Sequence, residues 1–125
     1  MEIFLSNASG KALYEQIYDK IKQEILEGGL KAGEPLPTIR GLAKDLRISV
    51  ITTARAYADL ERDGYIYSVV GKGSFVAEQN AQFVRETNYK EMESRLKEAA
   101  EIAARSGVSK EEFIKLAELF FGEKE

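Results

Sequence analysis

The sequence contains no cysteine and no histidine among its 125 residues. The lack of cysteine excludes disulfides and thiolate metal sites. The lack of histidine removes the commonest general base, the commonest metal ligand and the side chain that titrates near neutral pH. We therefore expect no catalytic residues, no metal site and no cofactor.

Long apolar runs are absent as well. No stretch of about 18 apolar residues occurs, and the N-terminus lacks a basic segment followed by an apolar one. These absences predict no membrane span and no signal peptide, and they favour a cytoplasmic protein. A chain of this length is expected to fold as one small domain, with or without an appendage.

Acidic residues are scarce in one stretch, although the net charge is -3. Residues 1–77 carry ten basic and ten acidic side chains, whereas residues 78–125 carry eight and eleven. Within residues 38–57, Asp45 is the only acidic residue, and the basic ones are Arg40, Lys44, Arg47 and Arg55. This stretch is weakly basic, which suits contact with nucleic acid.

Hydrophobic spacing predicts three helices in the first half of the chain. One helix carries Leu13, Tyr14, Ile17, Tyr18, Ile21 and Ile25 on one face, before Gly28 and Gly29. Thr38 is a predicted N-cap of a short second helix, and Ser49 is the predicted N-cap of a third helix that Gly64 ends. A short helix, a tight turn and a longer helix are typical of a helix-turn-helix.

After Gly64, the spacing of the hydrophobic residues changes from that of a helix to that of β-strands. Residues 65–70 and 74–77 are rich in β-formers, and the glycines of residues 71–73 separate them. A hairpin directly after a helix-turn-helix is a wing. The "GKGS" of this hairpin does not fit a phosphate loop, because Gly73 interrupts the motif and a strand follows.

Two further helices are predicted in residues 78–125, after the polar link "EQNAQ". The first carries Tyr89, Met92, Leu96, Ala99 and Ala103 at spacings of three and four, and Gly107 ends it. Ser109 and Glu112 form a predicted capping box for the second, whose apolar face includes Phe113, Ile114, Leu116, Ala117, Leu119, Phe120 and Phe121. So much apolar surface favours an interface over a solvated tail.

The third helix begins with four β-branched residues, Val50 to Thr53, which are poor helix formers. In a helix-turn-helix, the first residues of the second helix meet base edges in the major groove. Hydroxyl and methyl groups there can contact phosphates and thymine methyls. We expect Thr53 in the core and Val50, Ile51 and Thr52 at DNA. The alternative is that Val50 and Ile51 pack on the turn or on a neighbouring chain.

The stretch "LPTIRGLAKDLRISVITTARAYADLERDGYIYSVVGKGSFV" resembles the winged helix-turn-helix of the GntR superfamily of bacterial transcription regulators. Its pattern is close to L-P-S-x-R-x-L-A, V-S-x-x-T, A-Y-x-x-L-E-x-x-G-Y-I and G-x-G-[ST]-F-V, and the likeness covers about residues 11–77. The short two-helix tail is similar to that of the YtrA subfamily, whose members dimerise through it. The implied fold is mostly α with a small β-hairpin: a winged helix-turn-helix (residues 1–77) followed by a two-helix dimerisation tail (residues 78–125).

The resemblance implies roles for particular residues. It places the recognition helix, residues 49–63, in the major groove and the wing, residues 65–77, near the minor groove. The residues assigned to DNA are Thr38, Arg40, Ser49, Val50, Ile51, Thr52, Arg55, Lys72 and Gly73. Those assigned to dimerisation are Tyr89, Met92, Leu96, Ala103, Phe113, Leu116, Phe120 and Phe121.

One departure from the family pattern concerns base readout. Many members have basic residues at the positions that Val50 and Ala54 occupy here. Either methyl contacts and DNA shape replace bidentate arginine in this chain, or its affinity for DNA is modest.

The resulting hypothesis is a sequence-specific DNA-binding regulator, a repressor by family resemblance, that binds a two-fold symmetric operator as a homodimer. The alternative is a winged-helix protein-protein adaptor without direct DNA readout, which an acidic or apolar recognition face would favour. The tail is too small to enclose a usual ligand cavity within one chain. An effector pocket between two chains is left open.

Overall fold

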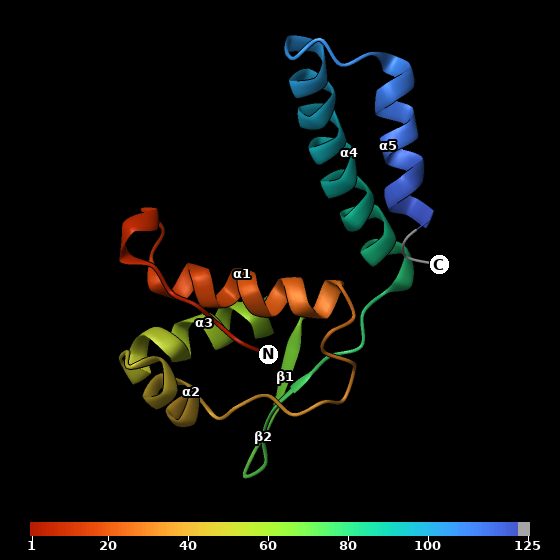
Figure 1. Ribbon diagram of the computed structural model, residues 1–125. Helices are drawn as coiled ribbons and strands as arrows, with labels where there is room; N and C mark the ends of the chain where they lie inside the picture. The colour runs from red at the N-terminus through yellow and green to blue at the C-terminus, as the bar shows by residue number, and fades with distance from the viewer. Residues whose placement is uncertain (123–125) are drawn as a thin grey trace. The chain divides into compact units, whose positions relative to one another are not determined.

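A computed structural model describes residues 1–122 of the chain (Figure 1). The elements are η1 (Asn7–Ser9), α1 (Leu13–Leu26), α2 (Ile39–Leu46), α3 (Val50–Arg62), β1 (Ile66–Val69), β2 (Gly73–Val76), α4 (Ala81–Arg105) and α5 (Lys110–Gly122). The predicted fold class, helices with one small hairpin, is confirmed. The chain divides into a first unit, Met1–Val84, and a second unit that starts at Arg85. No described helix is both long and apolar enough to cross a membrane.

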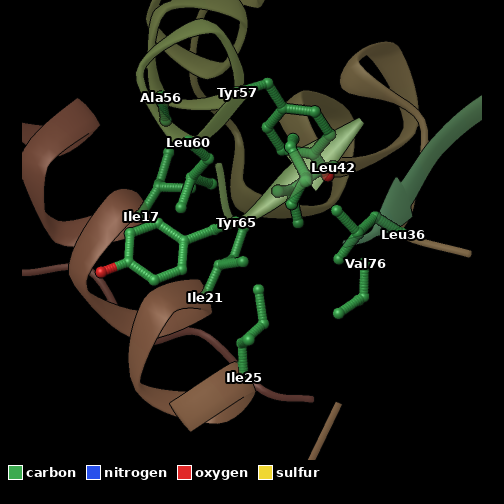
Figure 2. Close-up of a cluster of buried hydrophobic side chains, with 11 residues drawn as sticks. Ile17, Ile21, Ile25, Leu36, Leu42, Ala56, Tyr57, Leu60, Tyr65 and Val76 are labelled. Atoms are coloured by element: carbon green, nitrogen blue, oxygen red, sulfur yellow. The ribbon is translucent and has the colours of Figure 1, made fainter. Parts of the chain in front are cut away.

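The core of the first unit lies between α1, α2, α3 and the hairpin (Figure 2). Ile17 and Ile21 of α1 and Leu60 of α3 are completely buried. Tyr65 and Val76 bring the hairpin into the same cluster, so the wing is anchored by the core that holds the helices together.

The predicted helix starts are confirmed by their caps. Thr38 Oγ1 accepts a hydrogen bond from the Gly41 N–H at 3.0 Å, and Ser49 Oγ accepts one from the Thr52 N–H at 3.0 Å. Thr53 is fully buried, as predicted, and its hydroxyl donates to the Ser49 carbonyl at 3.2 Å.

The wing is a two-stranded antiparallel hairpin in which Ile66 pairs with Val76 and Val69 pairs with Gly73. The Lys72 N–H donates to the Val69 carbonyl at 2.9 Å, which closes the tip. Gly71 and Gly73 have φ of 79° and 109°, so both positions suit glycine. The predicted wing is therefore present.

Residues 33–36 pair with the free edge of β2, a contact that the sequence analysis missed. The Leu36 N–H donates to the Ser74 carbonyl and the Val76 N–H donates to the Glu34 carbonyl, both at 2.9 Å. The connection that precedes α2 is thus attached to the wing.

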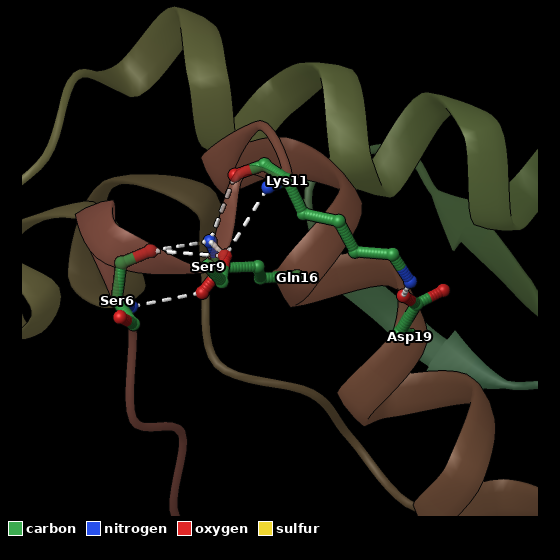
Figure 3. A network of polar contacts seen from close by, with 5 residues as sticks. All are labelled: Ser6, Ser9, Lys11, Gln16 and Asp19. Carbon is green, nitrogen blue, oxygen red and sulfur yellow. Dashed lines mark hydrogen bonds and ion pairs between the residues drawn. The ribbon is translucent and has the colours of Figure 1, made fainter.

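The N-terminal segment is attached to α1 by the side chains of Gln16 and Asp19, the latter through an ion pair with Lys11 (Figure 3). The Gln16 amide nitrogen donates to the carbonyls of Ser6 and Lys11, and its oxygen accepts from the Ser6 N–H. Ile3 and Leu5 pack partly buried against the core. This arm therefore belongs to the first unit.

The predicted polar link of residues 78–82 is too long by two residues, because α4 already begins at Ala81. Asn80 Oδ1 accepts a hydrogen bond from the Phe83 N–H at 3.0 Å, and this cap starts the helix early. The predicted cap of α5 is confirmed, since Ser109 Oγ accepts from the Glu112 N–H at 3.1 Å.

Candidate nucleic-acid interface

The predicted DNA-binding residues lie on three elements of the first unit: the start of α2, the start of α3 and the wing tip. Tyr57 of α3 donates its hydroxyl hydrogen to the Pro37 carbonyl at 2.7 Å, directly before the cap of α2. Residues 33–36 connect the same segment to β2. The three elements are therefore held in one frame by backbone pairing and one buried hydroxyl.

Burial raises the pKa of Tyr57 to about 12, so its phenol remains a hydrogen-bond donor at neutral pH. Neither Tyr57 nor residues 33–36 were predicted to support the site. Tyr57 shares an i, i+3, i+4 face with core residues, and that spacing does not indicate what a polar atom at the end of a ring will contact.

The first turn of α3 presents apolar and hydroxyl groups to solvent. Ile51 is 82% exposed and Val50 is 41% exposed. The Ser49 hydroxyl accepts from the Thr52 N–H and donates to Thr52 Oγ1 at 2.8 Å, so its own proton is used. The Thr52 hydroxyl proton has no acceptor among residues 1–122, which makes Thr52 the better donor to an external phosphate or base.

Unpaired cations occur on the other two elements of the site. Within the described chain, Arg40 at the start of α2 and Lys72 at the wing tip are exposed and make no ion pair. The guanidinium of Arg55 stacks on the Tyr14 ring, with its central carbon 3.8 Å from the ring centroid. Stacking restricts the rotamers of Arg55 but leaves the N–H groups at its edge available.

Some cations elsewhere in the first unit are neutralised by ion pairs. Lys11 pairs with Asp19, and Lys20 pairs with Glu24 at 3.1 Å. Arg62, at the end of α3, pairs with Asp59 at 2.8 Å. Lys31 in the loop before α2, Lys44 near the end of α2 and Arg47 after it form no ion pair with a described residue.

The C-terminal end of α3 is acidic in character. An open groove of about 320 Å³ is lined there by Tyr14, Glu15, Tyr18, Asp19, Asp59, Arg62 and Asp63. Hydrogen bonds from Arg62 and from the Tyr18 hydroxyl hold the pKa of Asp63 below its usual value. Burial, followed by the bond to Asp63, raises the pKa of Tyr18. The two ends of α3 therefore differ in charge, because Asp59 and Asp63 lie at its C-terminal end and its first turn contains no acidic residue.

No group of three or more possible metal ligands occurs among residues 1–122. The acidic groove is instead occupied by the ion pairs and the tyrosine contact just described.

The predicted dimerisation residues lie on α4 and α5 with large exposed surfaces. Tyr89, Met92, Leu96, Leu116, Phe120 and Phe121 are exposed, and Ala103 and Phe113 are partly buried. Leu96, Phe113 and Phe121 are among the residues that line an open, apolar groove of about 560 Å³ within the second unit. Exposed apolar residues that the prediction omitted are Ile102, Ile114 and Leu119.

The architecture agrees with comparisons with known proteins. The family model described as "Bacterial regulatory proteins, gntR family" matches residues 13–76. The chain belongs to this family. The matched segment runs from the start of α1 to the end of β2, so it contains the whole winged helix-turn-helix.

Relatives and solved structures extend this finding. The HTH-type transcriptional repressor YtrA of Bacillus subtilis is 37% identical over 70 residues, which are 56% of this chain and 54% of that protein. A transcriptional regulator from Oenococcus oeni has a TM-score of 0.69 at 28% identity, over 94% of this chain and 97% of that one. AraR(DBD), solved in complex with operator ORX1, has a TM-score of 0.55 at 29% identity, over 62% of this chain and 96% of that one.

The predicted membership of the GntR superfamily and the likeness to YtrA are thus confirmed, and the chain spans about half the length of the YtrA repressor. The family and these relatives are regulators, which agrees with the prediction that the chain is not an enzyme.

Proposed function

We propose that this gntR-family chain is a transcription repressor that binds a two-fold symmetric DNA operator as a homodimer. In this proposal α3 enters the major groove and the wing lies near the minor groove. The observation that carries it is the exposed first turn of α3, where Ile51 and Thr52 are not part of the core cluster. The unpaired cations Arg40, at the start of α2, and Lys72, at the wing tip, support it.

Each interface residue has a role suited to its chemistry. Arg40 contacts a base or a phosphate, and Arg55 offers the edge of a stacked guanidinium. Val50 and Ile51 contact thymine methyls, while the Thr52 hydroxyl donates to DNA. The helix N-termini that Thr38 and Ser49 cap direct backbone N–H groups towards phosphates. Lys72 and Gly73 let the wing tip approach the minor groove.

The homodimer rests on the second unit. The dimerisation residues form one stripe on α4 and a broader one on α5, and no residue of either helix is buried. Each large apolar side chain left in water forfeits about 1.5 to 3 kcal/mol. A second copy of the chain covers these stripes and brings two recognition helices to half-sites about 34 Å apart. Residues 1–77 then bind DNA and residues 78–125 join the copies.

Selection of bound sequences from a random duplex pool tests the proposal. We expect one preferred sequence with two-fold symmetry, and an affinity that falls steeply with salt because several phosphates are neutralised per dimer. A pool without any preferred sequence at low salt would contradict sequence-specific binding and favour the adaptor alternative. An asymmetric single half-site would contradict the dimer alone.

A further inference from the structure

Arg47 has an unusual backbone conformation. It is the only residue other than glycine with a positive φ in the described chain, with φ 58° and ψ 46°. It ends α2: its N–H donates to the Lys44 carbonyl at 3.2 Å, and the N–H of Ile48 donates to the Ala43 carbonyl at 3.0 Å. This is a Schellman-type helix end, where glycine is the usual residue.

The chain uses glycine at its other left-handed helix ends. Gly28 after α1, Gly64 after α3 and Gly107 after α4 all have positive φ. A side chain with a Cβ atom is strained in this conformation, whereas glycine is not. Arg47 therefore replaces the residue that would suit the backbone best.

No polar or ring contact within the described residues accounts for an arginine at position 47. Arg47 is exposed, and its guanidinium makes no ion pair, ring contact or hydrogen bond with any of residues 1–122. The folded chain thus carries the strain although the guanidinium has no partner among the described residues.

The position of Arg47 next to the start of α3 indicates a binding partner for its guanidinium outside the chain. Ser49, the cap of α3, follows two residues later, so the two Cα atoms lie within about 7.6 Å of each other. The Arg47 side chain is attached to the turn between α2 and α3, and not to the helix face that carries Val50 and Ile51. If α3 enters the major groove as proposed, a cation on this turn is suited to a backbone phosphate beside the groove, because phosphate contacts position a protein on DNA without reading base edges.

We propose that Arg47 binds a DNA phosphate flanking the first turn of α3, and that the strained turn conformation is kept for this contact. The inference rests on the proposed function, because it requires α3 to bind DNA. It adds a residue that neither the motif pattern nor the predicted site assigned to DNA. A contact to phosphate contributes affinity for every sequence alike.

Arg47→Gly in the full chain tests both halves of the proposal. Relief of strain should raise the melting temperature by about 2 to 6 °C at fixed protein concentration. Affinity for the selected operator and for a scrambled duplex should fall by the same factor, about 3- to 10-fold. The slope of log K against log salt should become less negative by about 0.9 for each of the two chains.

Matched variants separate charge from backbone. Arg47→Asn, which tolerates the left-handed conformation, should lose affinity like the glycine variant, whereas Arg47→Lys should retain most of it. Lys31→Ala removes an unpaired cation of the same unit away from the turn and should leave the salt slope unchanged.

The outcomes are distinguishable. If the wild type selects an operator and Arg47→Gly binds it with an unchanged salt slope, the phosphate contact is wrong and the proposed function stands. A lower melting temperature for Arg47→Gly would show that the arginine stabilises the fold, which also overturns the inference. If the wild type binds no duplex with preference, the proposed function itself fails.

Discussion

The two units of the chain treat their apolar side chains differently. In the first unit, side chains from α1, α2, α3 and the hairpin form one cluster, and Ile17, Ile21 and Leu60 are completely buried. In the second unit, the helices carry aromatic and aliphatic residues of similar size, yet none is buried. The first unit has a core of its own, whereas the second presents material for an interface.

This difference shows that amphipathic spacing alone does not say what a helix packs against. The stripes of α1 and of α5 have the same period, but only the first meets enough neighbouring elements to be covered. In our proposal the missing cover for α4 and α5 is a second copy. This difference between the two units can be tested by substitutions that should affect one unit and leave the other unchanged.

The largest effect is expected from Phe120→Glu, on a side chain that is 56% exposed. In the proposed dimer, the substitution removes two phenylalanine side chains from the interface. Association should weaken by about 3 to 6 kcal/mol, since burial of each side chain contributes about 1.5 to 3 kcal/mol. Sedimentation at micromolar concentration should show a monomer with an intact helical spectrum, and operator binding should be severely weakened.

Lys115→Glu is the matched control, because it places the same new side chain on the opposite face of α5. It should leave the dimer intact. A dimer that survives Phe120→Glu would remove this stripe of α5 from the interface.

Leu60→Ala should have the next largest effect, and on the first unit. Leu60 is completely buried, so the substitution should lower the free energy of unfolding by about 2 to 5 kcal/mol in urea titrations. Leu119→Ala on α5 removes a side chain that is 57% exposed and lies outside the predicted dimer residues. Its cost should stay below about 0.5 kcal/mol. Equal losses would mean that α5 is packed as tightly as α3.

Much of the first unit could be predicted because its local signals agree with one another. Thr38 and Ser49 cap the helices that the apolar spacing indicates, and Gly64 ends α3 with a positive φ. The buried position of Thr53 followed from the face it shares with Leu60. Each of these features depends on residues that lie close together in the sequence, within the length of a single helix.

Features that depend on distant pairing could not be predicted. Residues 33–36 contain Pro35, which indicates a loop, and their bonds to β2 arise only after the chain has folded. The bond from Tyr57 to Pro37 joins residues 20 apart in the sequence. The left-handed end of α2 was missed because Arg47 is not the glycine that signals it.

Arg40→Ala should have a smaller effect, confined to DNA binding. If Arg40 contacts a base, its loss should cost about 1 to 3 kcal/mol of binding free energy and relax preference at one operator position.

Lys72→Ala should weaken binding to all sequences alike and flatten the salt dependence. Gel-shift titrations on the selected operator and on single-position variants distinguish them. An equal loss on every sequence for Arg40→Ala would make it a phosphate contact.

Neither variant should change sedimentation, because both residues belong to the first unit. If either variant unfolded at a lower temperature, the substituted cation would be stabilising the fold. We do not expect this, because Arg40 and Lys72 are exposed and form no ion pair with a described residue.

The smallest effect is expected from Tyr57→Phe, which removes one hydroxyl from the frame of the first unit. The Pro37 carbonyl loses its donor, which should cost about 1 kcal/mol of stability at neutral pH. The pKa of Tyr57 is raised by burial to about 12, against about 10 in an unfolded chain. The folded state therefore keeps this proton where the unfolded state gives it up, so stability is complete below pH 10 and falls between pH 10 and 12.

Urea unfolding at pH 7, 9, 10 and 11 tests this prediction. The wild type should lose stability above pH 10, and Tyr57→Phe should lose less over the same interval, because one of the two tyrosines with a raised pKa is gone. Tyr18, whose pKa is raised in the same direction, accounts for the remaining loss, so Tyr18→Phe is the natural comparison. Parallel pH profiles for the wild type and Tyr57→Phe would show that the buried phenol does not control alkaline stability, even though it connects α3 to the start of α2.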